Sequence, residues 1–294
     1  MIQERLKALR AEMEKRGITV YVVPTADFHE SEYVGDHFKA RKFITGFTGS
    51  AGTAVITLDE AGLWTDGRYF VQAENQLKDS TVTLYRMGEE GVPTVDEFVK
   101  DRLKEGGCLG FDGRVVNGTW GGKLEKIAAE KNVSMHVTED LIDLIWEDRP
   151  ALSKQPLFIL EEKYSGKSTA DKIADLRKAM KENGADVHIL TSLYDIAWLL
   201  NIRGNDIDYV PVVLSYLVLN ETECIWFLQE EVVDDKIRAY LEENHITTKP
   251  YDAIYDYVPE IPADAVVLMN RGTVNYRIAV SYTHLRAHET RHDL

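Results

Sequence analysis

The sequence has few cysteines, no surplus of positive charge and no long apolar run, and each shortage excludes a class of protein. Only two cysteines occur among 294 residues, Cys108 and Cys224, and strand-like residues flank both. Two such cysteines do not make the disulfide framework of a small secreted domain. We expect reduced, buried thiols in a cytosolic protein.

The charge balance is acidic, with 49 Asp and Glu residues against 34 Lys and Arg residues and a net charge of −15. A protein that binds nucleic acid needs a basic face, so this class is excluded. No apolar run approaches the length needed to span a membrane. Residues 1–17 predict a charged amphipathic helix rather than a signal peptide, so we expect a cytoplasmic protein with no membrane or nucleic-acid partner.

The first half of the chain alternates helices and strands, which is typical of an α/β domain. Apolar residues at Ile2, Leu6, Leu9 and Met13 recur at helical spacing, and Gly17 ends that helix. Prolines at 150 and 156 interrupt regular structure, so we expect a first domain over residues 1–150. The remaining pattern predicts strands at 20–23, 52–58, 63–66, 82–87 and 109–111, and helices at 68–77, 94–103, 123–131 and 141–146.

The second half repeats this order, which predicts a second α/β domain over residues 156–280. Ser168 is a good cap for a helix that Gly184 ends, and the apolar stretch 211–219 predicts a central strand. Each half then carries a tryptophan on its third strand, Trp64 or Trp226, so we interpret the chain as a duplicated domain. Further strands are predicted at 187–191, 224–228 and 265–269, and helices at 194–200 and 232–242.

The last residues, 281–294, differ from everything before them. They hold three of the eight histidines and show no clear apolar period. We expect a non-native or disordered tail outside the fold. A His-rich metal-binding tract is the competing interpretation.

A glycine-dense loop, residues 46–52, precedes a buried strand. A phosphate-binding loop would need a lysine there, and a nucleophile elbow would need a glycine where Thr48 stands. The pattern instead predicts a tight turn that feeds a strand, with glycine supplying backbone freedom or close approach.

Asp66, Arg68 and Tyr69 follow the next strand and form the best candidate binding site. In one interpretation Asp66 and Arg68 make a turn salt bridge, which contributes little when it is exposed. In the other, Asp66 and the neighbouring aromatic residues hold the Arg68 guanidinium ready for a carboxylate or a carbonyl. The sequence leaves both interpretations open.

A local cluster of His and carboxylate residues lies upstream, at His29, Glu30, Glu32, Asp36 and His37. These residue types bind metals. The segment follows a proline and has the composition of a loop, so we expect a solvated polar surface rather than a metal site.

Several motifs resemble those of the three-domain cytosolic Xaa-Pro aminopeptidases (aminopeptidase P). They are YVVPTADFHESEY at 21–33, GFTGSAGTA at 46–54, WTDGRYF at 64–70, LIWEDRP at 144–150 and DIAWLLNIRG at 195–204. The likeness extends over residues 2–279. It implies two similar creatinase N-terminal-like, ribonuclease H-like α/β domains with mixed sheets, followed in the family by a catalytic pita-bread domain.

The resemblance also implies an activity for the parent enzyme. In the family, two divalent metal ions (Mn or Zn) are held by two Asp, one His and two Glu of the third domain, which removes an N-terminal residue that precedes proline. None of those ligands can be assigned here, so we expect no catalytic residue, metal ligand or cofactor in this chain, and no activity from it alone. The family assigns a substrate contact to Arg68, with Asp66 and Tyr69 in support, and a homodimer that acts on proline-containing peptides.

Two other functions fit part of the pattern. A non-catalytic protein-binding module would reuse this fold, and the acidic balance would suit basic partners. The retained WTDGRYF stretch at 64–70 argues against it. A prolidase-type dipeptidase fragment is the other, and the motif at 21–33 favours aminopeptidase P over it.

Overall fold

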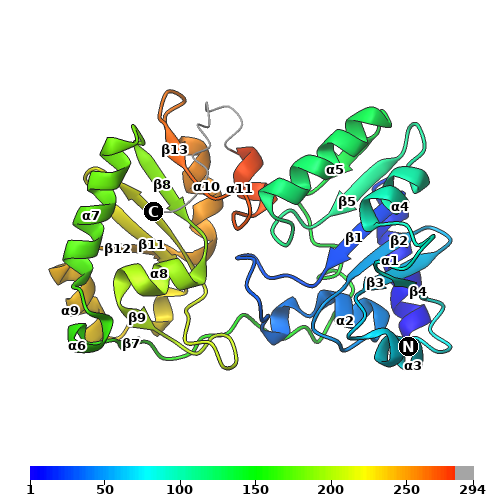
Figure 1. The fold of residues 1–294 in the computed structure, drawn as a ribbon, viewed down its shortest axis with the longest axis horizontal. Helices are drawn as coiled ribbons and strands as arrows, with labels where there is room; N and C mark the ends of the chain where they lie inside the picture. The colour runs from blue at the N-terminus through cyan, green and yellow to red at the C-terminus, as the bar shows by residue number, and fades with distance from the viewer. Residues whose placement is uncertain (282–294) are drawn as a thin grey trace. The chain divides into compact units, whose positions relative to one another are not determined.

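The computed structural model describes residues 1–281, which form two compact units. The first unit comprises Met1–Phe28 and Asp36–Ala151, and the second comprises His29–Gly35 and the residues from Leu152 onward. Figure 1 follows the chain through both units. The loop His29–Gly35 therefore belongs to the second unit, although segments of the first unit flank it in sequence.

The first unit is built on a six-stranded mixed sheet of order β4-β3-β2-β1-β5-β6. Strand β2 runs antiparallel to β1 and β3, whereas the β3–β4, β1–β5 and β5–β6 pairs are parallel. The strands are β1 (Val20–Pro24), β2 (Thr53–Thr57), β3 (Ala61–Thr65), β4 (Thr83–Arg86), β5 (Cys108–Phe111) and β6 (Ser134–His136).

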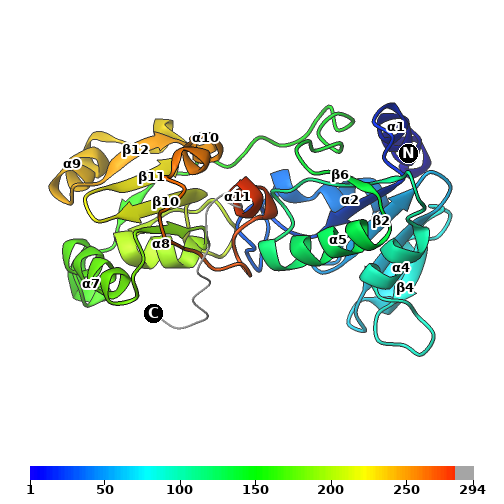
Figure 2. The same cartoon turned by 90° about the horizontal axis from the view of Figure 1, so that it is seen from above.

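Helices cover both faces of this sheet (Figure 2). The apolar stripe of α1, with Leu6, Leu9 and Met13, packs together with Phe43 and Ile44 of α2 in one buried cluster. Helices α4 and α5 lie on the opposite face, and α4 begins with a capping box between Thr94 and Glu97. The helices are α1 (Ile2–Lys15), η1 (Asp36–Phe38), α2 (Ala40–Thr45), α3 (Phe70–Gln76), α4 (Val95–Arg102) and α5 (Gly118–Glu130).

The second unit repeats this sheet with five strands in the order β12-β11-β10-β8-β13. The β8–β10 and β10–β11 pairs are antiparallel, and the β11–β12 and β8–β13 pairs are parallel, as in the first unit. Strand β10 is central, as its apolar sequence predicted. The strands are β8 (Val187–Leu190), β10 (Ser215–Asn220), β11 (Cys224–Leu228), β12 (Thr247–Pro250) and β13 (Val267–Leu268), with a separate pair of β7 (Phe158–Ile159) and β9 (Ile202–Arg203).

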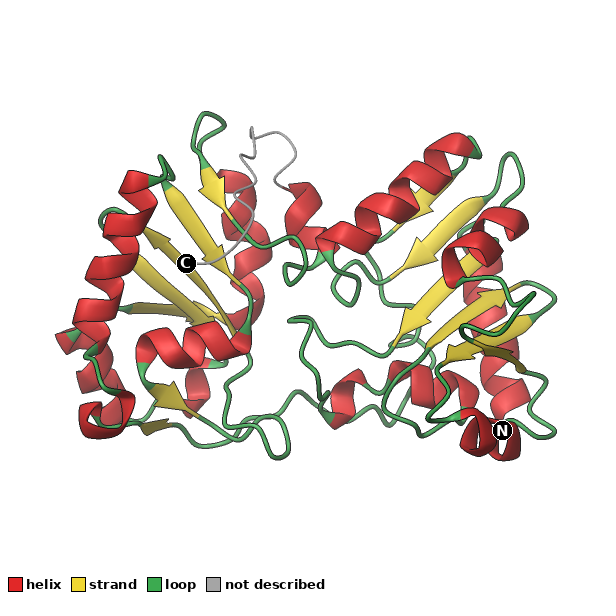
Figure 3. Cartoon of the chain, in the orientation of Figure 1, coloured by secondary structure: helices red, strands yellow, loops and turns green. Residues whose placement is uncertain are grey.

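The duplicated α/β architecture is thus confirmed by two sheets with matching strand directions. Trp64 on β3 and Trp226 on β11 occupy matching strands, and both are fully buried. Helices flank the second sheet as well (Figure 3). They are α6 (Glu162–Ser165), α7 (Thr169–Glu182), α8 (Leu193–Leu200), η2 (Glu230–Val232), α9 (Asp235–Glu243), η3 (Tyr251–Ala253), α10 (Ile254–Tyr257), η4 (Val258–Glu260) and α11 (Tyr276–Ser281).

The helix expected at 141–146 is wrong, because this stretch forms hydrogen-bonded turns. The Asp140 carboxylate accepts the Ile142 amide at 2.9 Å, and the Ile145 amide donates to the Ile142 carbonyl at 3.1 Å, a spacing shorter than that of an α-helix. Helix α5 begins at Gly118, earlier than expected, because the Asn117 side chain caps it. Strands β6, β7, β9 and β12 and helices α6, α10 and α11 were not predicted.

The C-terminal end of the described chain is helix α11, whose last residue is Ser281. Ser281 was expected to begin the tail, yet its hydroxyl donates to the Arg277 carbonyl at 2.7 Å. The rest of the predicted tail, 282–294, lies outside the described residues. No helix within residues 1–281 is both long enough and apolar enough to cross a membrane.

Candidate functional site

The glycine loop is shaped by close approach of neighbouring groups. Gly46 ends α2 in the left-handed conformation, with φ of 78°. A Cβ on Gly49 would lie 2.2 Å from Cζ of Phe47, and a Cβ on Gly52 would lie 2.8 Å from the Trp64 carbonyl oxygen. A side chain at either position would therefore displace a buried ring or the β3 backbone.

Asp66 and Arg68 form a two-pronged ion pair on the turn after β3. Nε and Nη2 of Arg68 donate to the two carboxylate oxygens of Asp66 at 2.8 and 2.9 Å, and the Arg68 amide donates to Asp66 Oδ1 at 3.1 Å. These hydrogen bonds lower the pKa of Asp66 to about 2 and raise that of Arg68. The pair is therefore ionised at neutral pH and points the guanidinium in a fixed direction.

The Arg68 side chain remains 71% exposed despite this pair. A guanidinium has five N–H donors, and Asp66 takes two of them. Nη1 makes no hydrogen bond to any residue in the described part of the chain. The edge formed by Nη1 and Nη2 is thus available to a carboxylate or carbonyl, which is the geometry of a second two-pronged contact.

Tyr69 links this turn to the glycine loop. Its ring centroid lies 5.3 Å from Cζ of Arg68, and its hydroxyl is 2.6 Å from Oγ of Ser50. Phe47 meets the Tyr69 ring edge-on, at 5.9 Å between centroids. The structure therefore brings the three candidate residues of the sequence together and adds Ser50 to them.

Arg41 is a component that the sequence did not indicate. It is 3% exposed, and its guanidinium lies beside the glycine loop, where it donates to the Phe47 and Gly49 carbonyls and, at 2.9 Å, to the Thr25 hydroxyl. Burial lowers its pKa to about 10, so it remains charged at neutral pH. In the sequence Arg41 stands next to Lys42 on the short helix α2, and two adjacent basic residues are usually exposed to solvent. The sequence therefore gives no sign that Arg41 is buried.

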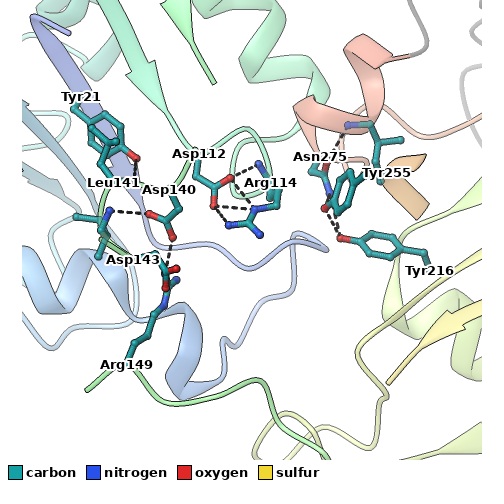
Figure 4. A network of polar contacts seen from close by, with 12 residues as sticks. Tyr21, Asp112, Arg114, Asp140, Leu141, Asp143, Arg149, Tyr216, Tyr255 and Asn275 are labelled. Carbon is teal, nitrogen blue, oxygen red and sulfur yellow. Dashed lines mark hydrogen bonds and ion pairs between the residues drawn. The ribbon is translucent and has the colours of Figure 1, made fainter. Parts of the chain in front are cut away.

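A second polar cluster of the first unit follows β5 and β6 (Figure 4). Nη1 of Arg149 lies 2.6 Å from Asp140 Oδ2, and both side chains are more than nine-tenths buried. Arg114 pairs with the buried Asp112 at 3.0 Å. Burial and the nearby Asp112 charge raise the pKa of Asp140. Asp112 and Asp140 are thus each paired with an arginine. We therefore interpret these two ion pairs as structural contacts of the first unit rather than as a binding site.

His29 contradicts the expectation of a solvated surface, because it is 2% exposed within the second unit. Its Nδ1 lies 3.0 Å from the Thr191 carbonyl oxygen, and its Nε2 lies 2.6 Å from the Tyr251 hydroxyl. A carbonyl accepts only, so Nδ1 donates to Thr191, and in the neutral imidazole Nε2 accepts from the Tyr251 hydroxyl. Glu30 and Glu32 are exposed, as expected.

Further hydroxyls of the second unit lie close to this histidine. The centroid of the Tyr216 ring is 4.5 Å from that of the His29 ring. The Tyr216 hydroxyl is 2.9 Å from the Tyr255 hydroxyl. Asn275 donates to both tyrosines at 3.3 and 3.2 Å (Figure 4). The buried hydrogen bonds to Thr191 and Tyr251 anchor His29, the first residue of the His29–Gly35 loop, in the second unit.

Residues 1–281 contain no group of three or more His, Cys, Asp or Glu side chains that could hold a metal ion. His29 and His37 belong to different units. The described residues therefore do not fit a two-metal centre.

Comparison with known proteins assigns both units to one family. Two models, each described as a creatinase/prolidase N-terminal domain, match residues 5–145 and 148–293. A probable Xaa-Pro aminopeptidase P of Neurospora crassa is 41% identical over 255 residues, which cover 86% of this chain and 37% of that protein. Aminopeptidase P2 of Arabidopsis thaliana is 35% identical over 288 residues, or 96% of this chain and 40% of that protein.

A solved structure supports the same assignment. X-prolyl aminopeptidase of Caenorhabditis elegans, described as a cytosolic enzyme with a di-nuclear active site, matches with a TM-score of 0.92 and 31% identity. The match covers 99% of this chain and 50% of that one, so the chain spans half or less of the length of these relatives. The chain consists of two creatinase/prolidase N-terminal domains in tandem and belongs to the family of the Xaa-Pro aminopeptidases.

Proposed function

We propose that this chain is the N-terminal part of a metal-dependent Xaa-Pro aminopeptidase, which removes an N-terminal residue that precedes proline. The observation that carries the proposal is the match to X-prolyl aminopeptidase over 99% of the chain, with both domains in the same order. The relatives extend well beyond the matched region. The chemistry is assigned to that further region.

The two divalent metal ions, Mn or Zn, belong to the catalytic part of the enzyme in this proposal. A metal-bound water would supply the nucleophile there. Since the described residues offer no ligand set, no step of the reaction is assigned to them. Their contribution is to bind and orient the peptide, to limit access to the site and to provide contacts for a homodimer. The enzyme is proposed to act in the cytoplasm.

Arg68 is the proposed substrate contact. Its guanidinium is oriented by Asp66 and keeps an exposed edge of two nitrogens. A side chain that is already oriented loses little conformational entropy when it binds, so more of the contact energy appears as affinity. The edge fits a peptide carbonyl or a terminal carboxylate. A lysine would keep the charge but would not present this planar pair of donors.

The test is steady-state kinetics of the full-length enzyme on an Xaa-Pro peptide. Both Arg68→Ala and Arg68→Lys are expected to lower kcat/KM by about 10- to 100-fold, as for the loss of a charged hydrogen-bond partner. Arg10→Lys is the control, because Arg10 is another arginine of the first unit, and its hydrogen bond goes to the Thr57 carbonyl, at 2.9 Å, at the end of β2 away from the loop. Wild-type kcat/KM in both folded Arg68 variants would reject the contact.

A further inference from the structure

Arg41 is a buried cation that has no counter-charge among residues 1–281. Among the described residues no carboxylate lies within ion-pair distance of it, and its partners are two carbonyls and one hydroxyl. Its guanidinium also lies over the Phe47 ring, 4.7 Å from the centroid. A buried charge is costly even when it is hydrogen-bonded, and an apolar side chain would fill the same space at a smaller cost. Packing alone therefore does not explain a cation at this position, and its hydrogen bonds are the feature that an apolar side chain would lack.

Its hydrogen bonds fix the shape of the glycine loop. The two terminal nitrogens bind carbonyls of residues two apart, Phe47 and Gly49, while Nε anchors the group to Thr25 at the end of β1. A rigid planar fork sets the spacing of the two carbonyls, which a single ammonium group does not do. The Phe47 and Gly49 carbonyls of the loop are thus both held by one side chain.

The loop contacts the Tyr69 side chain through two of its residues, Ser50 and Phe47. Ser50 follows Gly49 directly, and its hydroxyl is 2.6 Å from the Tyr69 hydroxyl. Phe47, under the Arg41 guanidinium, contacts the Tyr69 ring. The Ala51 carbonyl accepts the Thr65 hydroxyl at 2.7 Å, which ties the end of the loop to β3 just before the Asp66 turn. Tyr69 in turn supports one face of the Arg68 guanidinium.

We propose that Arg41 is a positioning residue that holds the loop 47–51, and through Ser50 and Tyr69 sets the place at which Arg68 meets the peptide. This inference rests on the proposed substrate contact of Arg68. In this proposal the glycine loop is a rigid support for Arg68, and Arg41 holds the loop in its conformation.

The first arm of the test measures the loop itself, on the 294-residue chain. Hydrogen exchange is followed at the amides of Phe47 and Thr48, which donate to the Thr45 hydroxyl at 3.2 Å and to Gln76 at 2.8 Å. Arg41→Lys is expected to speed exchange at both amides by about tenfold or more, and Arg10→Lys to leave them unchanged. Unchanged exchange in Arg41→Lys would overturn the proposal.

The second arm is a double-mutant cycle in the full-length enzyme with Arg41→Lys, Arg68→Ala and both together. Arg41→Lys is expected to raise KM by about fivefold with kcat within about twofold, and to add less than about twofold in the Arg68→Ala background. Equal effects in both backgrounds would show a general structural role and overturn the proposal.

The outcomes separate the two proposals. If Arg68→Ala leaves kcat/KM unchanged, the substrate contact is rejected, and the positioning role with it. If Arg68→Ala is impaired while Arg41→Lys is not, only the positioning role is rejected. Should Arg41→Lys fail to fold, Ser50→Ala removes the link to Tyr69 without touching Arg41, and it is expected to raise KM in the same way, again only while Arg68 is present. A KM unchanged in Ser50→Ala would overturn the proposal.

Discussion

The Phe47 ring lies directly against Gly49, so close that a Cβ on Gly49 would be 2.2 Å from the ring atom Cζ. Phe47 is fully buried, with the Arg41 guanidinium over its face and the Tyr69 ring at its edge. The ring is therefore confined at one face, at its edge and at Gly49. The absence of a side chain at position 49 is a packing requirement of the loop.

Gly49→Ala is accordingly expected to destabilise the first unit. Forcing an extra carbon into a well-packed site costs about 1–3 kcal/mol. Urea unfolding gives the loss, and Gly67→Ala is the matched control, since the nearest atom to a Cβ at 67 is 3.8 Å away on Phe70. Gly67→Ala is expected to stay within about 0.5 kcal/mol of the wild type. Equal losses in the two variants would contradict the packing argument.

Asp66→Asn tests whether the exposed arginine needs its orienting partner. The amide keeps one acceptor oxygen but replaces the other with an NH2 donor, so only one of the two hydrogen bonds from the Arg68 guanidinium survives. We expect a rise in KM smaller than that of Arg68→Ala in the full-length enzyme. Because the pKa of Asp66 is about 2, its carboxylate stays ionised above pH 4, and Asp66 should add no step to the pH profile of kcat/KM there.

The sequence predicted those residues of the site whose partners are close in sequence, and it missed Arg41. Asp66, Arg68 and Tyr69 contact one another within four positions, so local pattern was sufficient to group them. Arg41 was missed because two of its three acceptors are backbone carbonyls, which no residue type marks. The periodicity of apolar residues predicted the duplicated α/β fold, since it records burial element by element.

His29 shows the opposite case, in which local composition misled. Its neighbours Glu30 and Glu32 are exposed, and the segment has the character of a surface loop. Its partners Thr191 and Tyr251 lie 162 and 222 residues away in sequence. Because His29 is buried by residues so distant in sequence, the pattern of apolar residues around it gives no sign of its burial.

The buried pair of Asp140 and Arg149 gives a stability prediction. Arg149→Met leaves the Asp140 carboxylate buried beside Asp112 without its cation, which is expected to cost about 3–5 kcal/mol. The double variant Asp140→Asn with Arg149→Met removes both charges and should recover much of that loss. Chemical denaturation of the three proteins measures it. A single variant as stable as the wild type would contradict the prediction.

The pH dependence of that loss has a definite sign. An acid whose folded-state pKa is raised binds its proton more readily when folded, so its contribution to stability falls as pH rises through the folded pKa. Burial and Asp112 already raise the pKa of Asp140, and loss of Arg149 should raise it further. The deficit of Arg149→Met should therefore be smaller near pH 4 than at pH 7.

His188 gives the clearest prediction for the second unit. It lies on β8 between Leu219 and Leu268 of the neighbouring strands, its Nδ1 is buried without a hydrogen-bond partner among the described residues, and burial lowers its pKa to about 4. Above pH 6.5 the side chain is neutral in both states and has no effect. Below pH 6.5 the unfolded chain binds the proton first, so stability falls until about pH 4, by up to about 3 kcal/mol.

His188→Leu removes this titration and places an apolar side chain between apolar neighbours. The free energy of unfolding of the variant relative to wild type should therefore rise steadily as pH falls from 7 to 4. Hydrogen exchange of the β8 and β10 amides under denaturant reports this unit, and His245→Asn controls for loss of an exposed histidine at a positive φ that asparagine tolerates. A difference between His188→Leu and wild type that does not change with pH would show that the His188 imidazole is not the group that makes this domain sensitive to acid.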